Sequence, residues 1–345
     1  MFNPKYTITQ KLLSNIKRIA TLIYELNNQR FPKVVLLEME KSARAVSSFS
    51  STSIEGNPLP LTEVKKILKS RPENLRDSEK EIINYNNALE ELDSLLASNK
   101  ADFNLKLILD IQKTIIKGLI AKHNCGKLRQ EPVLVNEPRI RKTIFLPPDH
   151  QDVKPLLTQL IQYINKNQKS VDPLILAGIF HKQFVIIHPF IDGNGRTVRV
   201  ATKLLLARMG LNTFNLFSFE NYYNNNITKY FNKVGVLGNY YDIKDKIDFT
   251  EWLEYFTDGI IDELLRINKE LNTAAISPDT TLKPYHQKIL DYIKDNGFIT
   301  DKDYSRLTNR AKATRSLDFK KLMEMELIER LGKGKGTYYK AKKEI

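Results

Sequence analysis

Hydrophobic residues recur every three or four positions through most of residues 1–280, which is the spacing of amphipathic helices. In residues 9–28 the apolar positions are Leu12, Leu13, Ile16, Ile19, Ala20 and Ile23, and Pro32 then interrupts the pattern. The same spacing predicts helices over residues 33–54, 62–68, 77–98, 104–117, 153–166, 173–187, 195–209 and 249–271. We therefore expect a mainly α fold in this part of the chain.

One segment, residues 131–146, departs from the helical pattern and reads EPVLVNEPRIRKTIFL. Val133, Leu134 and Val135 favour a strand, and so do residues 143–145, on the other side of a turn-like stretch at residues 136–138. The segment therefore predicts a small two-stranded hairpin.

The last 60 residues have a different order of elements. Helices are predicted over residues 285–296, 301–307 and 312–325, and strands over residues 327–331 and 337–342, around the glycine-rich turn at residues 332–336. Three helices followed by a hairpin is the layout of a winged helix-turn-helix.

A change in composition separates this C-terminal part from the rest. Residues 272–284 read NTAAISPDTTLKP, a run of small and polar residues with two prolines that is typical of a linker. We therefore expect an N-terminal helical region at residues 1–110, a helical core at 111–272, a linker at 273–283 and the winged helix at 284–345.

Composition narrows the class of protein. The chain has 345 residues, 41% of them hydrophobic and 27% charged, which is typical of a globular protein and excludes a disulfide-stapled mini-protein. A single cysteine, Cys125, cannot form an intramolecular disulfide, and no apolar run reaches the length of a membrane span. The first residues also lack the features of a secretory signal, so a cytoplasmic protein is expected.

The net charge of +14 is concentrated near the C-terminus. Residues 283–345 contain 16 Lys and Arg against 9 Asp and Glu, and so hold half of the excess. Positive charge on a winged helix favours contact with DNA. The candidate residues are Thr314, Arg315, Lys320 and Lys321 on the third helix and Lys333 and Lys335 in the wing. Contacts with protein, or a plain solvated surface, are the alternatives.

The densest chemical signal is residues 188–199, HPFIDGNGRTVR. A glycine-rich turn before a helix presents backbone N–H groups at the positive end of the helix dipole, which suits phosphate. Arg196 and Arg199 are three apart and share one face of the first turn, where both can donate to a polyphosphate. Asp192 offers an oxygen ligand for Mg²⁺, and His188 is a candidate general base.

This string resembles the Fic motif, His-Pro-Phe-x-Asp/Glu-Gly-Asn-Gly-Arg-x-x-Arg, at every defined position. The resemblance covers roughly residues 33–265. It implies a helical core with a β-hairpin flap, and the transfer of AMP from ATP to a hydroxyl side chain of a target protein. Its roles would be His188 as the base, Asp192 as the Mg²⁺ ligand, Gly193, Asn194 and Gly195 as the anion hole, and Arg196 and Arg199 as ligands of the outer phosphates.

A second segment, Ser51 to Asn57, resembles the family's inhibitory motif, with Ser51, Glu55 and Gly56 at its defined positions. A Glu55 carboxylate paired with Arg199 would occupy the guanidinium that the γ-phosphate needs. The alternative is that Gly56 and Pro58 only end a helix.

The resemblance also assigns residues around the active site. Val133, Leu134 and Val135 would belong to the flap that holds the target segment, and Tyr230, Phe231 and Asn239 would line the pocket for the nucleotide base. An ordinary edge hairpin and a hydrophobic core are the respective alternatives.

The sequence thus predicts a cytoplasmic protein adenylyltransferase that uses ATP and Mg²⁺ and is inhibited by Glu55. The expected partners are a target protein with a Ser, Thr or Tyr hydroxyl, DNA at the winged helix, and a second copy of the chain in a homodimer. Two alternative functions stay open. One is a hydrolase that removes AMP with the help of Glu55, and the other is a nucleotide-sensing transcriptional regulator.

Overall fold

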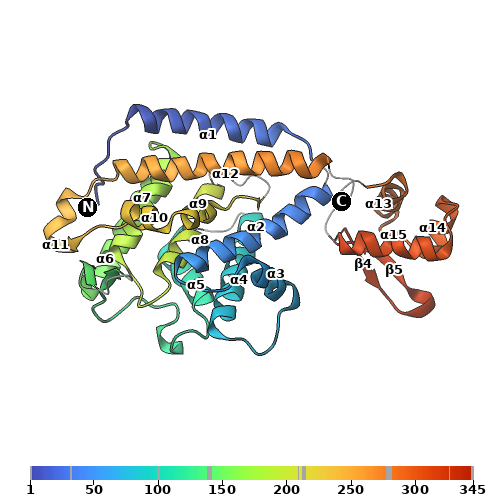
Figure 1. The fold of residues 1–345 in the computed structure, drawn as a ribbon, viewed down its shortest axis with the longest axis horizontal. Coiled ribbons are helices and arrows are strands. Elements are labelled where there is room, and N and C mark those ends of the chain that lie inside the picture. The colour runs from blue at the N-terminus through green and yellow to red at the C-terminus, as the bar shows by residue number, and fades with distance from the viewer. Residues whose placement is uncertain are drawn as a thin grey trace. The chain divides into compact units, whose positions relative to one another are not determined.

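The computed structural model describes residues 2–31, 33–98, 102–137, 142–208, 210–211, 215–276, 282–325 and 327–342. The chain forms two compact units. The large unit comprises residues 1–28 and 42–267, and the small unit comprises residues 29–41 and 268–345. Helices dominate (Figure 1), which confirms the predicted mainly α fold class. No helix within the described ranges is long and apolar enough to cross a membrane.

Where the apolar spacing predicts a helix in the large unit, the observed helix begins and ends close to the predicted positions. The helices of this unit are α1 (Gln10–Asn28), α3 (Leu61–Ser70), α4 (Asp77–Ser98), α5 (Leu105–Ile115), α6 (His150–Asn167), α7 (Pro173–Ile187), α8 (Asn194–Arg208), α9 (Phe219–Asn225), α10 (Ile227–Val234) and α11 (Tyr240–Ile243). Two further helices, α2 (Lys33–Ile54) and α12 (Thr250–Ile276), have residues in both units. The sequence prediction contains none of α9, α10 and α11, which have seven, eight and four residues.

Helix α7 is the centre of the large unit. Thirteen of its fifteen residues are buried, as expected for a helix that is apolar on every face. It packs against α6, α8 and α10, and the indole Nε1 of Trp252 in α12 donates to the carbonyl of Gly178 at 2.8 Å. Helix α1 lies along α12 (Figure 1), where Asn15 Nδ2 donates to Asp258 Oδ1 at 2.8 Å.

The predicted hairpin is formed by β1 (Val135–Glu137) and β2 (Lys142–Leu146), which are antiparallel. Val135 pairs with Phe145, and β3 (Gly238–Asn239) adds to β2 in parallel. Phe145 is buried against Ile186 of α7, so the sheet is anchored to the central helix.

The hairpin differs from the prediction in its details. Val133 and Leu134 precede the strand instead of belonging to it, and Asn136 lies inside β1 and not in the turn. A bulge between Val135 and Asn136 shifts the register. Pro138 of the expected turn lies outside the described residues.

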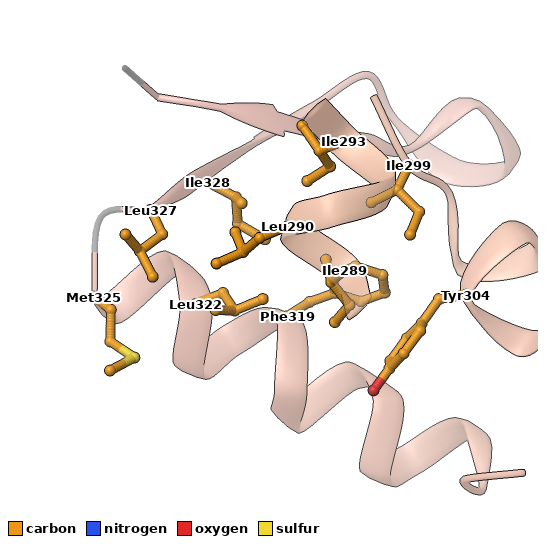
Figure 2. Packing of buried hydrophobic residues seen from close by; sticks show 10 residues of the cluster. All are labelled: Ile289, Leu290, Ile293, Ile299, Tyr304, Phe319, Leu322, Met325, Leu327 and Ile328. Atoms are coloured by element: carbon orange, nitrogen blue, oxygen red, sulfur yellow. The ribbon is translucent and has the colours of Figure 1, made fainter. Parts of the chain in front are cut away.

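The small unit has the order of elements that the sequence predicts. Its elements are α13 (Pro284–Asn296), α14 (Asp301–Leu307), α15 (Lys312–Glu324), β4 (Ile328–Leu331) and β5 (Tyr338–Ala341). Figure 2 shows its core, in which Ile289, Phe319 and Ile328 come from different elements. A bridge between Ile299 and Tyr339 joins the segment after α13 to β5. The predicted linker is partly helical, because α12 extends to Ile276, and residues 277–281 lie outside the described ranges.

Two arginines of the small unit are held by its own carboxylates. Arg315 donates from Nε and Nη2 to Asp301 at 2.8 and 2.9 Å, and from Nη1 to the carbonyl of Arg310. Arg310 in turn donates to both oxygens of the buried Asp318. These guanidinium groups therefore stabilise the unit, and the expectation that Arg315 faces nucleic acid is corrected.

The packing of α7 against α12 gives a first prediction. A Cβ added at Gly178 would lie 2.6 Å from Leu253 Cδ2 and 3.3 Å from Phe256 Cδ1. Gly178→Ala should therefore lower the free energy of unfolding by about 1–3 kcal/mol through overpacking. Urea denaturation checks this, with Gly336→Ala as the control because a Cβ there meets no atom within 4 Å. Equal effects of the two substitutions would contradict the packing described here.

Candidate active site

The candidate site begins where α7 ends. His188 adopts a left-handed backbone conformation with φ 50°, which is uncommon for a residue other than glycine, and its N–H still donates to Phe184 O at 3.0 Å. Pro189 follows and cannot continue the helix hydrogen bonds. The last turn of a buried helix therefore holds the imidazole at a fixed place.

The surroundings of His188 fix its protonation. Nδ1 lies 3.3 Å from the carbonyl oxygen of Val185, and because a carbonyl only accepts, Nδ1 carries the hydrogen and Nε2 keeps its lone pair. Burial lowers the pKa of His188 to about 4, with the nearby Arg129 acting in the same direction. The imidazole is therefore neutral at physiological pH and able to accept a proton.

Arg129, which the sequence analysis did not single out, holds the turn around His188. Its side chain is buried and donates to three carbonyl groups, those of His188 at 2.8 Å, Glu131 at 3.1 Å and Pro148. Its backbone N–H donates to Pro189 O at 3.0 Å. One side chain thus ties the end of α7 to the segments on both sides of the hairpin.

The loop from Phe190 to α8 is closed by a side chain. Asn194 accepts from the N–H of Phe190 at 2.9 Å and donates to its carbonyl at 2.8 Å. Gly193 has φ 81°, and its N–H donates to Asp192 Oδ1 at 2.5 Å. This geometry directs the start of α8, whose first N–H groups have no partner within the helix, toward the site.

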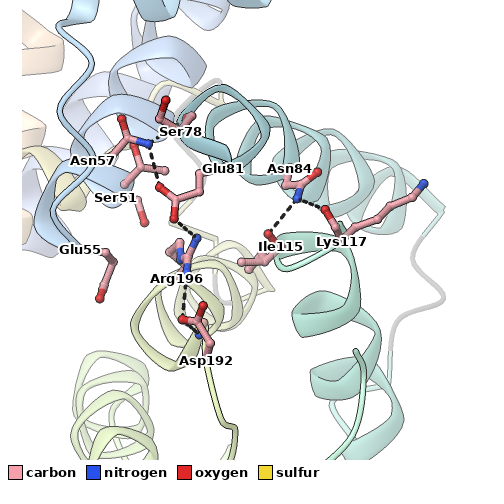
Figure 3. Close-up of polar contacts among 12 residues, drawn as sticks. Ser51, Glu55, Asn57, Ser78, Glu81, Asn84, Ile115, Lys117, Asp192 and Arg196 are labelled. Carbon is pink, nitrogen blue, oxygen red and sulfur yellow. Dashed lines mark hydrogen bonds and ion pairs between the residues drawn. The ribbon is translucent and has the colours of Figure 1, made fainter. Parts of the chain in front are cut away.

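Arg196 lies between two carboxylates (Figure 3). It donates from Nη1 to Glu81 Oε1 at 3.1 Å and from Nη2 to Asp192 Oδ1 at 3.0 Å. The second oxygen of Glu81 accepts from Asn57 Nδ2 at 2.7 Å. Arg196 is 4% exposed, so in this structure it orients Asp192, and its predicted contact with the phosphates stays a prediction.

Arg199 is the most deeply buried charged group of the site. Nε donates to Ser51 Oγ at 2.8 Å, and Nη2 donates to Ser51 O at 2.9 Å and to Glu55 Oε1 at 2.7 Å. Its side chain is 1% exposed. Burial lowers the pKa of Arg199 and the Glu55 carboxylate raises it, with a net upward change, so the guanidinium stays charged. The predicted pairing of Glu55 with Arg199 is thus present.

Glu55 also lies against the start of α8. A Cβ added at Gly195 would come within 2.1 Å of Glu55 Oε1 and 3.0 Å of Arg199 Nη1. Only a glycine therefore allows an anion this close to the helix N-terminus. The carboxylate lies at the place where the positive end of a helix and a buried guanidinium meet, which is an arrangement suited to a phosphate.

Unpartnered donors in the same place support this interpretation. Arg199 Nη1 and Arg196 Nε are buried without a hydrogen-bond partner among the residues that the structure describes. A buried donor without an acceptor destabilises the folded protein, and a bound ligand that supplies the acceptor removes this penalty.

The site also fits a magnesium ion. Asp192 is half-exposed, and its contacts with Gly193 and Arg196 both use Oδ1. Mg²⁺ is commonly held by one or two carboxylates together with phosphates and water. Within the described residues no cluster of three potential metal ligands exists, so the other ligands would come from the nucleotide and solvent.

The residues expected around the nucleotide base differ in their burial and contacts. Tyr230 is 1% exposed and stacks on Tyr223, and its hydroxyl lies 3.1 Å from His181 Nε2, as the core alternative describes. Phe231 is 42% exposed, and Asn239 caps α11 by accepting from the N–H of Tyr241.

The sequence analysis missed the residues that hold this site in place. Arg129, Glu81 and Gln112 contact the motif from elsewhere in the chain, Gln112 through a bond from Nε2 to the carbonyl of Asp192 at 3.2 Å. No local pattern marks them, because their partners lie 59 or more residues away.

The buried imidazole gives a prediction for pH titration. The His188 resonance in an NMR titration should shift near pH 4 and not near the ordinary value of about 6.5. Because the unfolded chain binds this proton at higher pH than the folded chain, the His188 contribution should lower the free energy of unfolding as pH falls from 6.5 to 4. The spectrum of His188→Gln assigns the signal, and a midpoint near 6.5 would show that the imidazole is solvated.

The segment that carries this site is similar to known proteins. Residues 102–206 match the model of the Fic/DOC family. The chain is similar to protein adenylyltransferase Fic from Aedes aegypti, with 29% identity over 228 residues that cover 60% of this chain and 43% of that protein. Protein adenylyltransferase Fic from Drosophila melanogaster is 27% identical over 217 residues, which cover 57% of this chain and 42% of that protein. The chain thus spans less than half the length of these relatives.

Solved structures show the same fold. A Fic family protein from Desulfovibrio desulfuricans superposes with a TM-score of 0.65 and 19% identity, over 99% of this chain and 98% of that chain. Residues 134–508 of Fic-1 from C. elegans superpose with a TM-score of 0.60 and 21% identity, over 76% of this chain and 73% of that chain. Residues 102–206, which match the model of the Fic/DOC family, include His188 and both arginines, so the candidate site lies inside the matched segment.

Proposed function

We propose that this protein is an adenylyltransferase that moves AMP from ATP to a hydroxyl side chain of a target protein, and that Glu55 inhibits it. One observation carries the proposal. A carboxylate occupies the place beside Gly195 and Arg199 where α8 is open to an anion, next to a neutral histidine. The names of the similar proteins support the same activity.

The chemistry follows from the placed groups. Nε2 of His188 accepts the proton of the target hydroxyl while the hydroxyl oxygen attacks the α-phosphorus. The new oxygen–phosphorus bond forms as the bond to the β-phosphate breaks and pyrophosphate leaves. The N–H groups of Asn194 and Gly195 and the guanidinium of Arg199 bind the phosphate oxygens, while the N–H of Gly193 holds Asp192. Mg²⁺ held by Asp192 would supply neutralisation of the phosphate charge.

Inhibition would follow from competition for Arg199. Glu55 and Ser51 use the Nε and Nη2 donors of the guanidinium, so the γ-phosphate meets a carboxylate of like charge where it would bind. ATP would then bind weakly or with its phosphates displaced. Glu55 is 30% exposed, which allows it to leave when its helix moves.

The reverse reaction is a second candidate. Glu55 is a partly exposed carboxylate whose charge acts on His188, so it could orient a water molecule toward an AMP-modified hydroxyl. For both candidate reactions we propose a cytoplasmic location, because a chain with the single cysteine Cys125 forms no internal disulfide.

Glu55→Gly tests the central proposal. Incubated with Mg²⁺ and ATP labelled at the α-phosphate, this variant should transfer label about 10- to 100-fold faster than the unchanged chain, because a charged hydrogen bond contributes roughly 1.5–3 kcal/mol. His188→Ala combined with Glu55→Gly should transfer none while still binding ATP. Release of AMP from a labelled target by the unchanged chain, but not by Glu55→Gly, would favour the reverse reaction. Absence of both activities would refute the proposal.

We propose DNA contact as a second function, in the small unit. Lys312 and Lys320 are exposed on α15, and Lys333 is exposed in the turn after β4, while Arg310 and Arg315 are bound internally. The available positive charge therefore comes from lysines, which favour phosphate contacts over reading of bases.

The prediction is salt-dependent binding of duplex DNA. Replacing Lys312 and Lys320 by alanine should weaken binding and reduce the slope of log K against log salt by about 2. The control replaces Lys66 and Lys106, two exposed lysines of the large unit, with the same change in charge. A control that weakens binding equally would show that only net charge matters.

A further inference from the structure

The contacts of α2 with α8 form a regular series. Ser51 Oγ accepts from Arg199 Nε at 2.8 Å, and one turn earlier on α2, Ser47 Oγ accepts from Lys203 Nζ at 2.8 Å. One turn later, Glu55 lies against Gly195. The partners rise by four residues along α2 and fall by four along α8, so one face of each helix makes all three contacts and the helices run in opposite directions.

Lys203 is itself held firmly. Besides Ser47, its ammonium donates to the carbonyl of Phe217 at 2.8 Å and lies 3.2 Å from Glu220 Oε2. Glu220 is fully buried and accepts from the hydroxyl of Tyr85 at 2.7 Å. All three ammonium hydrogens therefore have partners, and the buried pair cannot separate without leaving two charges unpaired.

The series ends at Ser47. One turn further back, the next positions of the series are Ala43 on α2 and Ala207 on α8, which have no polar side-chain atom and line a cavity of about 40 Å³. On the other side of Glu55, Asn57 is fixed to α4 by bonds from Nδ2 to Ser78 O at 2.8 Å and to Glu81 Oε2 at 2.7 Å (Figure 3). Glu55 thus lies between two anchors of its own segment.

We propose that Lys203 is a positioning residue for inhibition: through Ser47 it holds α2 in the register that places Glu55 against Arg199. This inference rests on the proposed function. Glu55 directly follows the end of α2 and lies eight residues after Ser47, a rise of about 12 Å along the helix, so Lys203 acts on the inhibitory carboxylate through α2. The contact at Ser47 thus adds to the bonds of Ser51 with Arg199 in fixing α2, and the rigid helix carries this constraint to Glu55.

Ser47→Ala is the test, because it removes the acceptor while leaving Lys203 with Phe217 and Glu220. It should raise transfer of labelled AMP, and affinity for ATP in calorimetry, by about three- to tenfold, which is less than Glu55→Gly because Asn57 still holds the segment. Ser47→Thr keeps the hydroxyl beside the cavity and should restore the unchanged behaviour. Ser50→Ala is the matched control, because Ser50 Oγ is buried on the same helix without a partner among the described residues.

The Glu55→Gly background separates positioning from a general structural effect. There, Ser47→Ala should change neither transfer nor ATP affinity, since the carboxylate that it positions is gone. Equal effects in both backgrounds, or no effect of Ser47→Ala in the unchanged chain, would overturn the inference. If Glu55→Gly transfers nothing, the proposed function fails, and the ATP affinities of the unchanged chain, Ser47→Ala, Glu55→Gly and the double variant still decide whether Ser47 controls access to Arg199.

Discussion

The buried guanidinium of Arg199 is the group on which the rest of the site depends. It is 1% exposed, and burial of a charge is tolerated only with partners, which here are Ser51 of α2 and Glu55 directly after α2. One donor atom, Nη1, is left without a partner among the described residues. The guanidinium that pairs with Glu55 in this structure can pair with a phosphate when Glu55 leaves. Inhibition and activity are therefore linked, because the Glu55 carboxylate and the phosphate compete for Arg199.

The fold fixes the positions of the groups around Arg199 and His188. The buried α7 ends at His188, a side-chain bond from Asn194 closes the following loop, and α8 begins at the point where an anion can approach its N–H groups. Polar contacts from distant parts of the chain hold each piece, with Arg129 behind His188 and Glu81 beside Arg196. Buried polar networks of this kind orient reacting groups because any displacement leaves a donor or an acceptor unpaired.

The helices and the motif at residues 188–199 could be predicted from the sequence, but the buried residues whose partners lie far along the chain could not. The apolar spacing predicts α2, α4 and α7 with the bounds that the structure has, and residues 188–199 identify the motif, because both signals lie within a few turns of chain. The pairing of Glu55 with Arg199 was accessible only through the resemblance to the inhibitory motif. Arg129, Glu81 and Lys203 had no such signal, because a buried arginine, glutamate or lysine has the same letter as an exposed one and its partners are set by tertiary packing.

A crystal structure of the Glu55→Gly variant with Mg²⁺ and a non-hydrolysable ATP analogue tests the central claim most directly. The account predicts a phosphate oxygen within hydrogen-bond distance of Arg199 Nη1 and of the first N–H groups of α8, in the volume that the Glu55 carboxylate occupies here. It also predicts the α-phosphate beside Nε2 of His188 and the metal on Asp192. Triphosphate bound elsewhere, with Arg199 still contacting only Ser51, would contradict the claim that Glu55 and the nucleotide compete for one site.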